Sequence, residues 1–128
     1  RFTDNGERRA IWLGPDEWLL IAPTDQASDI EASIEAALSS TPHSLVEVSH
    51  RSVGFALSGS AVEGVLAAGC PLDLDSRAFP EGMATRTVLG KTEIILQRTG
   101  SQNFQIDVWR SFADYALRFL VEAAMDYR

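Results

Sequence analysis

The sequence predicts an α+β fold with largely antiparallel sheets and three helices. Three times along the chain, short strand-like segments joined by turn residues are followed by a segment with helical periodicity. Strands paired through hairpins, with helices laid on one face, form this class of fold. The chain has 128 residues and no linker-like stretch divides it, so we expect one domain.

The first predicted hairpin pairs the apolar segments Ala10–Leu13 and Trp18–Ala22. Between them, Gly14-Pro15-Asp16-Glu17 suits a turn, because proline and aspartate favour the centre of a type I turn. Trp12 and Trp18 flank this turn, and we expect both to pack over the core.

A helix is predicted next, since Ser28 and Glu31 have capping-box spacing. An earlier start near Asp25 is the alternative. Apolar residues then recur at helical period, and they are Ile30, Ile34, Ala37 and Leu38.

The second predicted hairpin joins Leu45–Ser49 to Val53–Ser58 around His50 and Arg51. Apolar and small residues alternate along its second arm, as in a half-buried strand.

A short helix follows this hairpin. Ser60 and Glu63 have the spacing of a cap, Gly69 is placed to stop the helix, and residues 71–80 form a loop. The residues expected to face inward are Val62, Val65 and Leu66.

The last third predicts a hairpin, a strand and a helix. Thr85–Leu89 and Thr92–Arg98 flank Gly90-Lys91, a two-residue turn of the kind that needs glycine. Phe104, Ile106 and Val108 alternate with polar residues to give the strand, and Ser111 is the expected cap of the helix. The apolar stripe of this helix is Phe112, Tyr115, Ala116, Phe119, Leu120 and Ala123.

Composition and charge limit the function classes. Residues 1–9 are polar and aperiodic, and we interpret them as a trimmed product or the ordered remainder of a longer tail, with residues 10–128 as the domain. A net charge of −7 argues against nucleic-acid binding. No apolar run approaches a membrane span and no signal peptide is evident. The lone Cys70 suits a reducing compartment, so we expect a cytoplasmic protein.

Catalytic and metal-binding patterns are weak. His43, His50 and Cys70 are a poor basis for a metal site, and the run Ser49-His50-Arg51-Ser52 fits a polar turn better than a nucleophile–base pair. Cys70 follows a predicted helix C-terminus, which raises a thiol pKa, so we expect it to be a small packing residue. The glycines match neither the dinucleotide nor the phosphate-loop pattern.

Trp109 is the strongest candidate for a partner contact. It shares a strand face with Gln105 and Asp107, so either the chain's own helix covers it or it anchors a partner, because Trp and Arg are enriched at interface hot spots. The predicted partner-contact residues are Trp109, Arg110, Arg98, His50 and Arg51.

Beyond its first nine residues, the chain resembles the gamma subunit family of heterotetrameric sarcosine oxidase. The Cys-Pro-Leu-Asp-Leu run with the following Phe-Pro-x-Gly is the most specific part. Glu47 stands where relatives usually carry Asp, and Ser60 where Pro is common. The segments that carry the resemblance are WLGPDEWLLI (Trp12–Ile21), EVSHRS (Glu47–Ser52), LSGSA (Leu57–Ala61), CPLDLDSRAFPEG (Cys70–Gly82) and VWRSFADY (Val108–Tyr115).

The resemblance implies a fold similar to the folate-binding domain of the glycine-cleavage aminomethyltransferases. It also implies a non-catalytic subunit that stabilises an alpha subunit, in an assembly with beta and delta subunits. Such enzymes demethylate sarcosine to glycine, with hydrogen peroxide and formaldehyde or methylenetetrahydrofolate as further products. FAD, FMN, NAD and tetrahydrofolate are then expected in the partner subunits and no cofactor in this chain. The alternatives are a stand-alone tetrahydrofolate-binding module and, less favoured, a hydrolase that uses His50.

Overall fold

A computed structural model describes residues 1–127, so Arg128, the last residue of the predicted domain, lies outside the described residues. The small sheet has the order β1-β2-β3, and the larger sheet has the order β4-β7-β6-β5. Every pairing in both sheets is antiparallel. The predicted α+β class is therefore confirmed. The strands are β1 (Phe2–Asp4), β2 (Arg9–Gly14), β3 (Glu17–Ile21), β4 (Ser52–Ser58), β5 (Ala84–Leu89), β6 (Thr92–Gly100) and β7 (Asn103–Trp109), and the α-helices are α1 (Ala27–Ala37), α2 (Val62–Ala67) and α3 (Ala113–Ala124).

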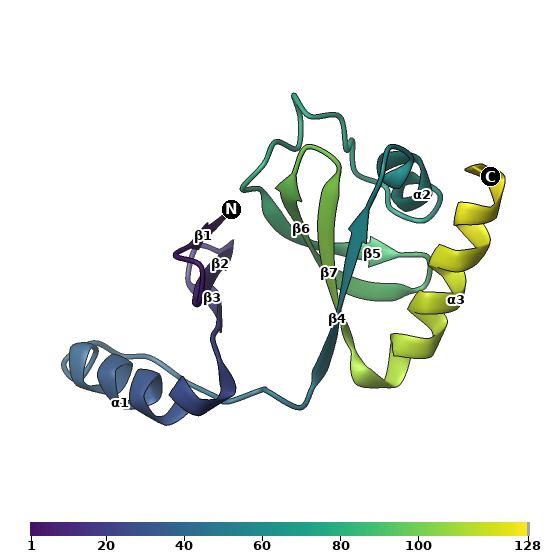
Figure 1. The fold of residues 1–128 in the computed structure, drawn as a ribbon. Coiled ribbons are helices and arrows are strands. Elements are labelled where there is room, and N and C mark those ends of the chain that lie inside the picture. Colours follow the sequence, from purple (N-terminus) through teal and green to yellow (C-terminus); the bar gives the residue numbers. More distant parts are fainter. Residues whose placement is uncertain (128) are drawn as a thin grey trace.

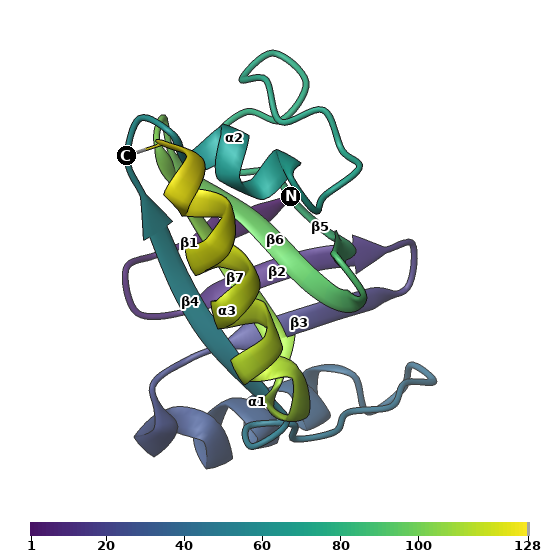
Figure 2. The ribbon, with the colours of Figure 1, turned by 90° about the vertical axis from the view of Figure 1, so that its right-hand side faces the viewer.

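The elements are arranged in three layers (Figure 1). The small sheet lies on one side of the larger sheet, and α2 and α3 lie on the other side. Figure 2, viewed from the helix side, shows α3 lying across the larger sheet and α1 at one end of the molecule. Within residues 1–127, none of the helices combines the length and apolar character that crossing a bilayer demands.

The hydrophobic core lies between the larger sheet and its two helices. Successive residues of a strand point to opposite faces, so alternate residues of β6 and β7 reach the core. Each fully buried apolar side chain contributes about 1.5–3 kcal/mol relative to an exposed one. The most buried core residues are Leu66, Leu89, Ile94, Leu96, Phe104, Ile106, Val108 and Ala116.

The small sheet includes residues that the sequence did not predict to be regular. β1 lies within the segment 1–9 and pairs with β2, with Phe2 opposite Ile11. The Phe2 backbone N–H donates to the Gly82 carbonyl at 2.8 Å, and the N-terminal ammonium donates to the Ala84 carbonyl at 3.0 Å. No strand was predicted in this segment, because β1 depends on a distant loop and on β2.

The prediction of the second hairpin was wrong. Leu45–Ser49 is not a strand, and β4 pairs instead with β7, from Ser52 opposite Trp109 to Ser58 opposite Asn103. The hairpin of β5 and β6 is confirmed, with Leu89 opposite Thr92. Gly90 has a φ of 61°, a left-handed value that favours glycine at this turn.

The three predicted serine caps are not formed. None of the three α-helices has a side-chain cap hydrogen bond in the described residues. Instead, the 3₁₀ turns Thr24–Gln26 and Arg110–Phe112 lead into α1 and α3, and the Val62 N–H donates to the Gly59 carbonyl at the start of α2. The start near Asp25 was the better alternative for the first helical segment. α2 ends before Gly69, as predicted.

The two tryptophans of the first hairpin do not pack over the core. Trp12 and Trp18 lie opposite each other in the small sheet and are 45% and 59% exposed. Their neighbour Ile11 points the other way and is fully buried. The hairpin itself is confirmed, but the face assigned to the core was wrong.

Candidate partner-contact site

The candidate site lies at the end of the larger sheet where β4 begins and β7 ends. The turn containing His50 and Arg51 leads into β4, and the 3₁₀ turn at Arg110 follows directly from β7. Because Ser52 pairs with Trp109, these distant segments lie side by side. The structure thus brings together four of the five predicted residues, the Trp109 cluster: His50, Arg51, Trp109 and Arg110.

Two hydrogen bonds to backbone carbonyls hold the Trp109 cluster in place. The Arg110 N–H donates to the Arg51 carbonyl at 2.8 Å, and the Arg110 guanidinium Nε–H donates to the His50 carbonyl at 3.1 Å. The Arg51 guanidinium carbon lies 6.0 Å from the centroid of the Trp109 ring, at the outer range of a cation–π contact. The cluster is therefore preorganised, which lowers the entropy cost of ordering it on binding.

The Trp109 cluster is open to solvent. Trp109 is 49% exposed, and the other three members are exposed as well. The alternative that the chain's own helix covers Trp109 is therefore wrong. A half-exposed tryptophan beside two arginines has the composition of an interface hot spot.

An ion pair joins the small sheet to the larger sheet. The Arg86 guanidinium, which donates to both oxygens of Glu17 at 3.1 and 3.2 Å, lowers the pKa of Glu17, and Arg51 adds a smaller effect in the same direction.

Arg98, the fifth predicted contact residue, is buried elsewhere. It is only 2% exposed, so its prediction as part of a polar surface rim was wrong. Its five N–H donors make five hydrogen bonds, and its guanidinium lies 4.8 Å from the centroid of the Phe104 ring. The acceptors are the carbonyls of Leu74, Phe79, Gly100 and Ser101 and the carboxylate of Glu63.

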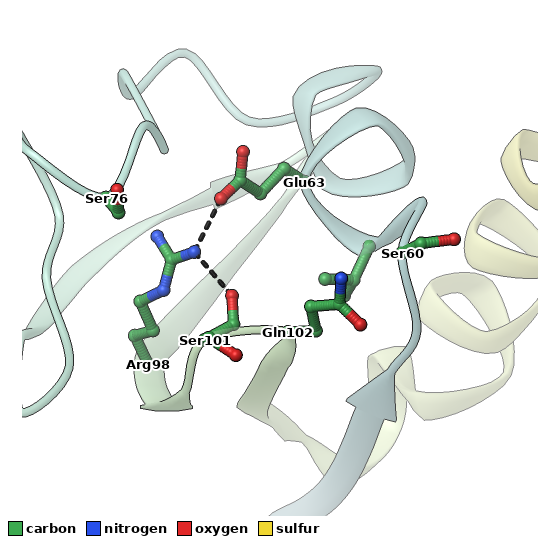
Figure 3. A pocket seen from close by; sticks show the side chains of 7 residues that line it. Ser60, Glu63, Ser76, Arg98, Ser101 and Gln102 are labelled. Atoms are coloured by element: carbon green, nitrogen blue, oxygen red, sulfur yellow. Dashed lines mark hydrogen bonds and ion pairs between the residues drawn. The ribbon is translucent and has the colours of Figure 1, made fainter.

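A pocket of about 320 Å³ lies against Arg98 (Figure 3). Figure 3 shows the guanidinium turned toward Glu63 and Ser101, which lie beside it. Since each Arg98 donor already has an acceptor in the chain, the guanidinium has no donor free for an anionic ligand. The pocket residues are Ser60, Val62, Glu63, Ser76, Arg98, Ser101 and Gln102.

The residues considered for catalysis or metal binding are not brought together. The Ser49 hydroxyl donates to Glu47 at 3.0 Å, and in residues 1–127 no hydrogen bond joins it to His50. His43 contacts the Thr41 carbonyl and Glu35, which together raise the pKa of His43. Cys70 is buried, as a packing residue should be. The described part of the chain holds no group of three or more His, Cys, Asp or Glu arranged for a metal ion.

A polar network between the two sheets was not predicted. Arg9 Nη1 donates to the buried Gln97 side-chain oxygen at 2.7 Å, and Gln97 Nε2 donates to Asp107 at 2.9 Å. Burial raises the pKa of Asp107, although Gln105, Arg9 and Gln97 act in the opposite direction. The strand alternation that places Gln97 and Asp107 on the face away from the core was the signal available in the sequence.

Comparison with known proteins gives consistent matches along the chain. Residues 2–126 match the family model "Sarcosine oxidase, gamma subunit family". The sarcosine oxidase subunit gamma of Corynebacterium sp. (strain P-1) is 36% identical over 117 residues, and that of an Arthrobacter species is 34% identical over 117 residues. Each alignment covers 91% of this chain and 57% of the relative, so the chain spans little more than half the length of these curated relatives.

A solved structure has the same fold. A chain of the heterotetrameric sarcosine oxidase from Corynebacterium sp. U-96, in complex with pyrrole 2-carboxylate, superposes with a TM-score of 0.89 at 31% identity. The match covers 98% of this chain and 63% of that chain. The family model, the relatives and the solved fold agree, and the chain belongs to the sarcosine oxidase gamma subunit family.

Proposed function

We propose that this chain is a non-catalytic subunit of a heterotetrameric sarcosine oxidase, in which it binds and stabilises the alpha subunit. The observation that carries the proposal is the likeness, over 98% of the chain, to a chain of a solved heterotetrameric sarcosine oxidase. The exposed and preorganised Trp109 cluster supports it, because it supplies a contact surface of suitable composition. We assign no catalytic residue to this chain.

The chemistry is proposed to take place in the partner subunits. There, sarcosine is demethylated to glycine, with hydrogen peroxide and formaldehyde or methylenetetrahydrofolate as further products. FAD, FMN, NAD and tetrahydrofolate belong to these partners, which are the alpha, beta and delta subunits. The lone buried Cys70 supports assembly in the reducing cytoplasm.

Copurification tests the proposed association. Coexpressed with its cognate alpha subunit, the chain should copurify, and Trp109→Ala should weaken the complex by about 2 kcal/mol or more, as expected for a hot-spot residue. Trp18→Ala is the matched control, since Trp18 is also an exposed tryptophan of a strand but lies outside the Trp109 cluster. If both subunits fold and do not associate, the proposal is wrong.

Calorimetry separates this proposal from a stand-alone folate-binding module. Titration of tetrahydrofolate into the isolated chain should give no saturable heat. The occupied donors of Arg98 support this expectation, because the pocket beside it then has no free guanidinium donor for the glutamate end of a folate. Saturable binding with one site per chain would favour the folate-binding module.

A further inference from the structure

A long stretch of the chain, which includes the connection between the two sheets, contains no buried residue. From Trp12 to Ala61, none of the described residues is buried. The acidic arm, residues 24–48, consists of the 3₁₀ turn Thr24–Gln26, α1 and the segment after it. In Figure 1, α1 lies at one end of the molecule, away from α2 and α3. Ordering a backbone costs about 1–2 kcal/mol per residue, and burial within this chain offsets little of that cost here.

The helix of the arm needs packing that the chain supplies only in part. α1 has eleven residues and no side-chain cap hydrogen bond, and isolated helices shorter than about 12–15 residues are marginally stable in water. Its apolar stripe, Ile30, Ile34 and Leu38, is half-buried. Val46, in the segment that follows, is 69% exposed. The arm therefore offers apolar surface that is still uncovered.

The arm is also strongly acidic. Residues 10–50 contain seven carboxylates and neither lysine nor arginine, so the chain's whole net charge of −7 falls on this segment. Five of these carboxylates lie in the arm, and all five are exposed. At 100° per residue, Glu31 and Glu35 border the apolar stripe on one side, whereas alanines border it on the other side and Asp29 lies toward the opposite face of the helix. The five are Asp25, Asp29, Glu31, Glu35 and Glu47.

We infer that the acidic arm docks into an apolar groove rimmed by lysine and arginine on the alpha subunit. Apolar contacts cover the stripe of α1, and the basic rim matches the bordering carboxylates, which steers the encounter and sets its register. A second copy of this chain does not fit, because two acidic arms repel each other, and nucleic acid is repelled in the same way.

The inference rests on the proposed function and deepens it by assigning a second contact surface. The superposition with the solved chain covers 98% of this chain. The residues outside the superposition are far fewer than those of the arm. The arm therefore belongs to the fold shared with a chain of a heterotetramer. It begins just after the small sheet and ends just before the Trp109 cluster, so one partner can contact both surfaces.

The test is a salt series on the complex of the full chain with its cognate alpha subunit. The arm variant Asp25→Asn/Asp29→Asn/Glu31→Gln keeps the shape of exposed side chains and removes three charges. Its affinity at low salt should be about tenfold lower than that of the unmodified chain. Between about 0.05 and 0.5 M NaCl its affinity should also fall less steeply.

Two further variants complete the test. The charge-matched control Glu81→Gln/Glu122→Gln/Asp126→Asn, at exposed positions outside the arm, should bind like the unmodified chain. Val46→Ser, which removes exposed apolar surface, should weaken binding at every salt concentration. Circular dichroism should show unchanged helix content for all variants.

The outcomes separate the two claims. If the unmodified chain binds and the arm variant binds equally well with the same salt dependence, the inference is overturned while the proposed function stands. Equal losses in the arm variant and the control also overturn it, because the effect is then net charge alone. If the unmodified chain does not bind the alpha subunit, both claims fail. If the isolated chain forms a homodimer and the arm variant does not, the arm binds a second copy of this chain, which would contradict the inference.

Discussion

Arg98 joins three parts of the fold through one side chain. Its guanidinium donates to carbonyls at both ends of the segment 74–79, to the turn after β6 and to Glu63 on α2. The bonds to the Leu74 and Phe79 carbonyls are buried, so losing Arg98 would leave these two carbonyls unsatisfied. A charged residue is rarely buried unless it is paired in this way.

Replacing Arg98 should destabilise the chain strongly. We expect Arg98→Ala to lower the free energy of unfolding by about 2–6 kcal/mol, because the two buried carbonyls would each be left unsatisfied at a cost of about 1–3 kcal/mol. Arg98→Lys should have an intermediate effect, because it keeps the charge but has only three donors. Urea denaturation followed by circular dichroism measures both. The control Arg118→Ala, at an exposed position of α3, should change stability by less than about 0.5 kcal/mol. A loss no larger than this for Arg98→Ala would contradict the assignment.

The Asp107 carboxyl, which lies between the sheets, makes the stability of the fold depend on pH. Burial raises the pKa of its carboxyl above the ordinary 3.8, so the folded state takes up a proton at a higher pH than the unfolded state does. Protonation therefore favours folding: this contribution to stability grows as the pH falls through the folded-state pKa toward 3.8, and it is lost as the pH rises again.

Asp107→Asn should remove this pH dependence. The difference in unfolding free energy, variant minus unmodified chain, should be larger at about pH 7 than at about pH 4, because only the unmodified chain carries the ionised carboxylate. Effects of the amide on hydrogen bonding to Gln97 do not depend on pH and cancel in this comparison. Urea denaturation over a pH series checks it, and a difference that stays constant with pH would show that burial does not control Asp107.

At the scale of elements, the end of α2 is packed closely against its neighbours. Gly69 follows the helix, and its carbonyl accepts the Gly90 N–H at 2.9 Å. A Cβ at Gly69 would lie 2.4 Å from the Phe119 ring and 2.8 Å from the Gly90 nitrogen. Glycine is therefore required here by the approach of the β5–β6 turn and α3, and not by a left-handed backbone.

Gly69→Ala should consequently be destabilising. We expect a loss of about 1–3 kcal/mol in unfolding free energy, as for other overpacked sites. Gly14→Ala is the control, since nothing lies within 4 Å of its would-be Cβ. Adding Phe119→Leu to Gly69→Ala should recover part of the loss in a double-mutant cycle. Additive effects of the two substitutions would mean that the Phe119 ring is not the obstacle.

The elements that the sequence predicted well are those with local partners. The β5–β6 hairpin has its turn glycine and both strands within one short segment, and the core face of β7 follows from the alternation of Phe104, Ile106 and Val108. β4 was given the wrong partner because β7 lies beyond an intervening helix, loop and hairpin, and Leu45–Ser49 offered an apolar run nearby. A local sequence pattern does not show which distant strand pairs with a given strand.

The candidate site was predicted only in part, because its residues come from segments that are distant in the sequence. Trp109 and Arg110 are neighbours in sequence, as are His50 and Arg51, but only the pairing of β4 with β7 brings the two pairs together. Arg98 was misplaced although it shares a strand face with Ile94 and Leu96. That alternation pointed into the core, whereas three of the five acceptors that make its burial tolerable come from distant segments, namely α2 and the segment 74–79.

At the scale of the whole molecule, burial is one-sided. The four-stranded sheet with α2 and α3 holds nearly all of the buried apolar residues, whereas the small sheet contributes Ile11. Polar contacts attach the small sheet: Arg9 to Gln97, Glu17 to Arg86, and backbone bonds at Gly82 and Ala84. Regions with few buried apolar contacts open at lower free energy than the core.

Native-state hydrogen exchange should therefore show two levels of opening. Amides of β1, β2 and β3 should exchange through a local opening, while amides of β6 and β7 exchange through global unfolding. Ile11→Ala, which removes about 2–5 kcal/mol of packing, should lower protection in the small sheet and leave β6 and β7 nearly unchanged. The control Ile106→Ala, in the main core, should lower protection in both sheets. A uniform loss of protection in Ile11→Ala would mean that the two sheets unfold as one cooperative unit.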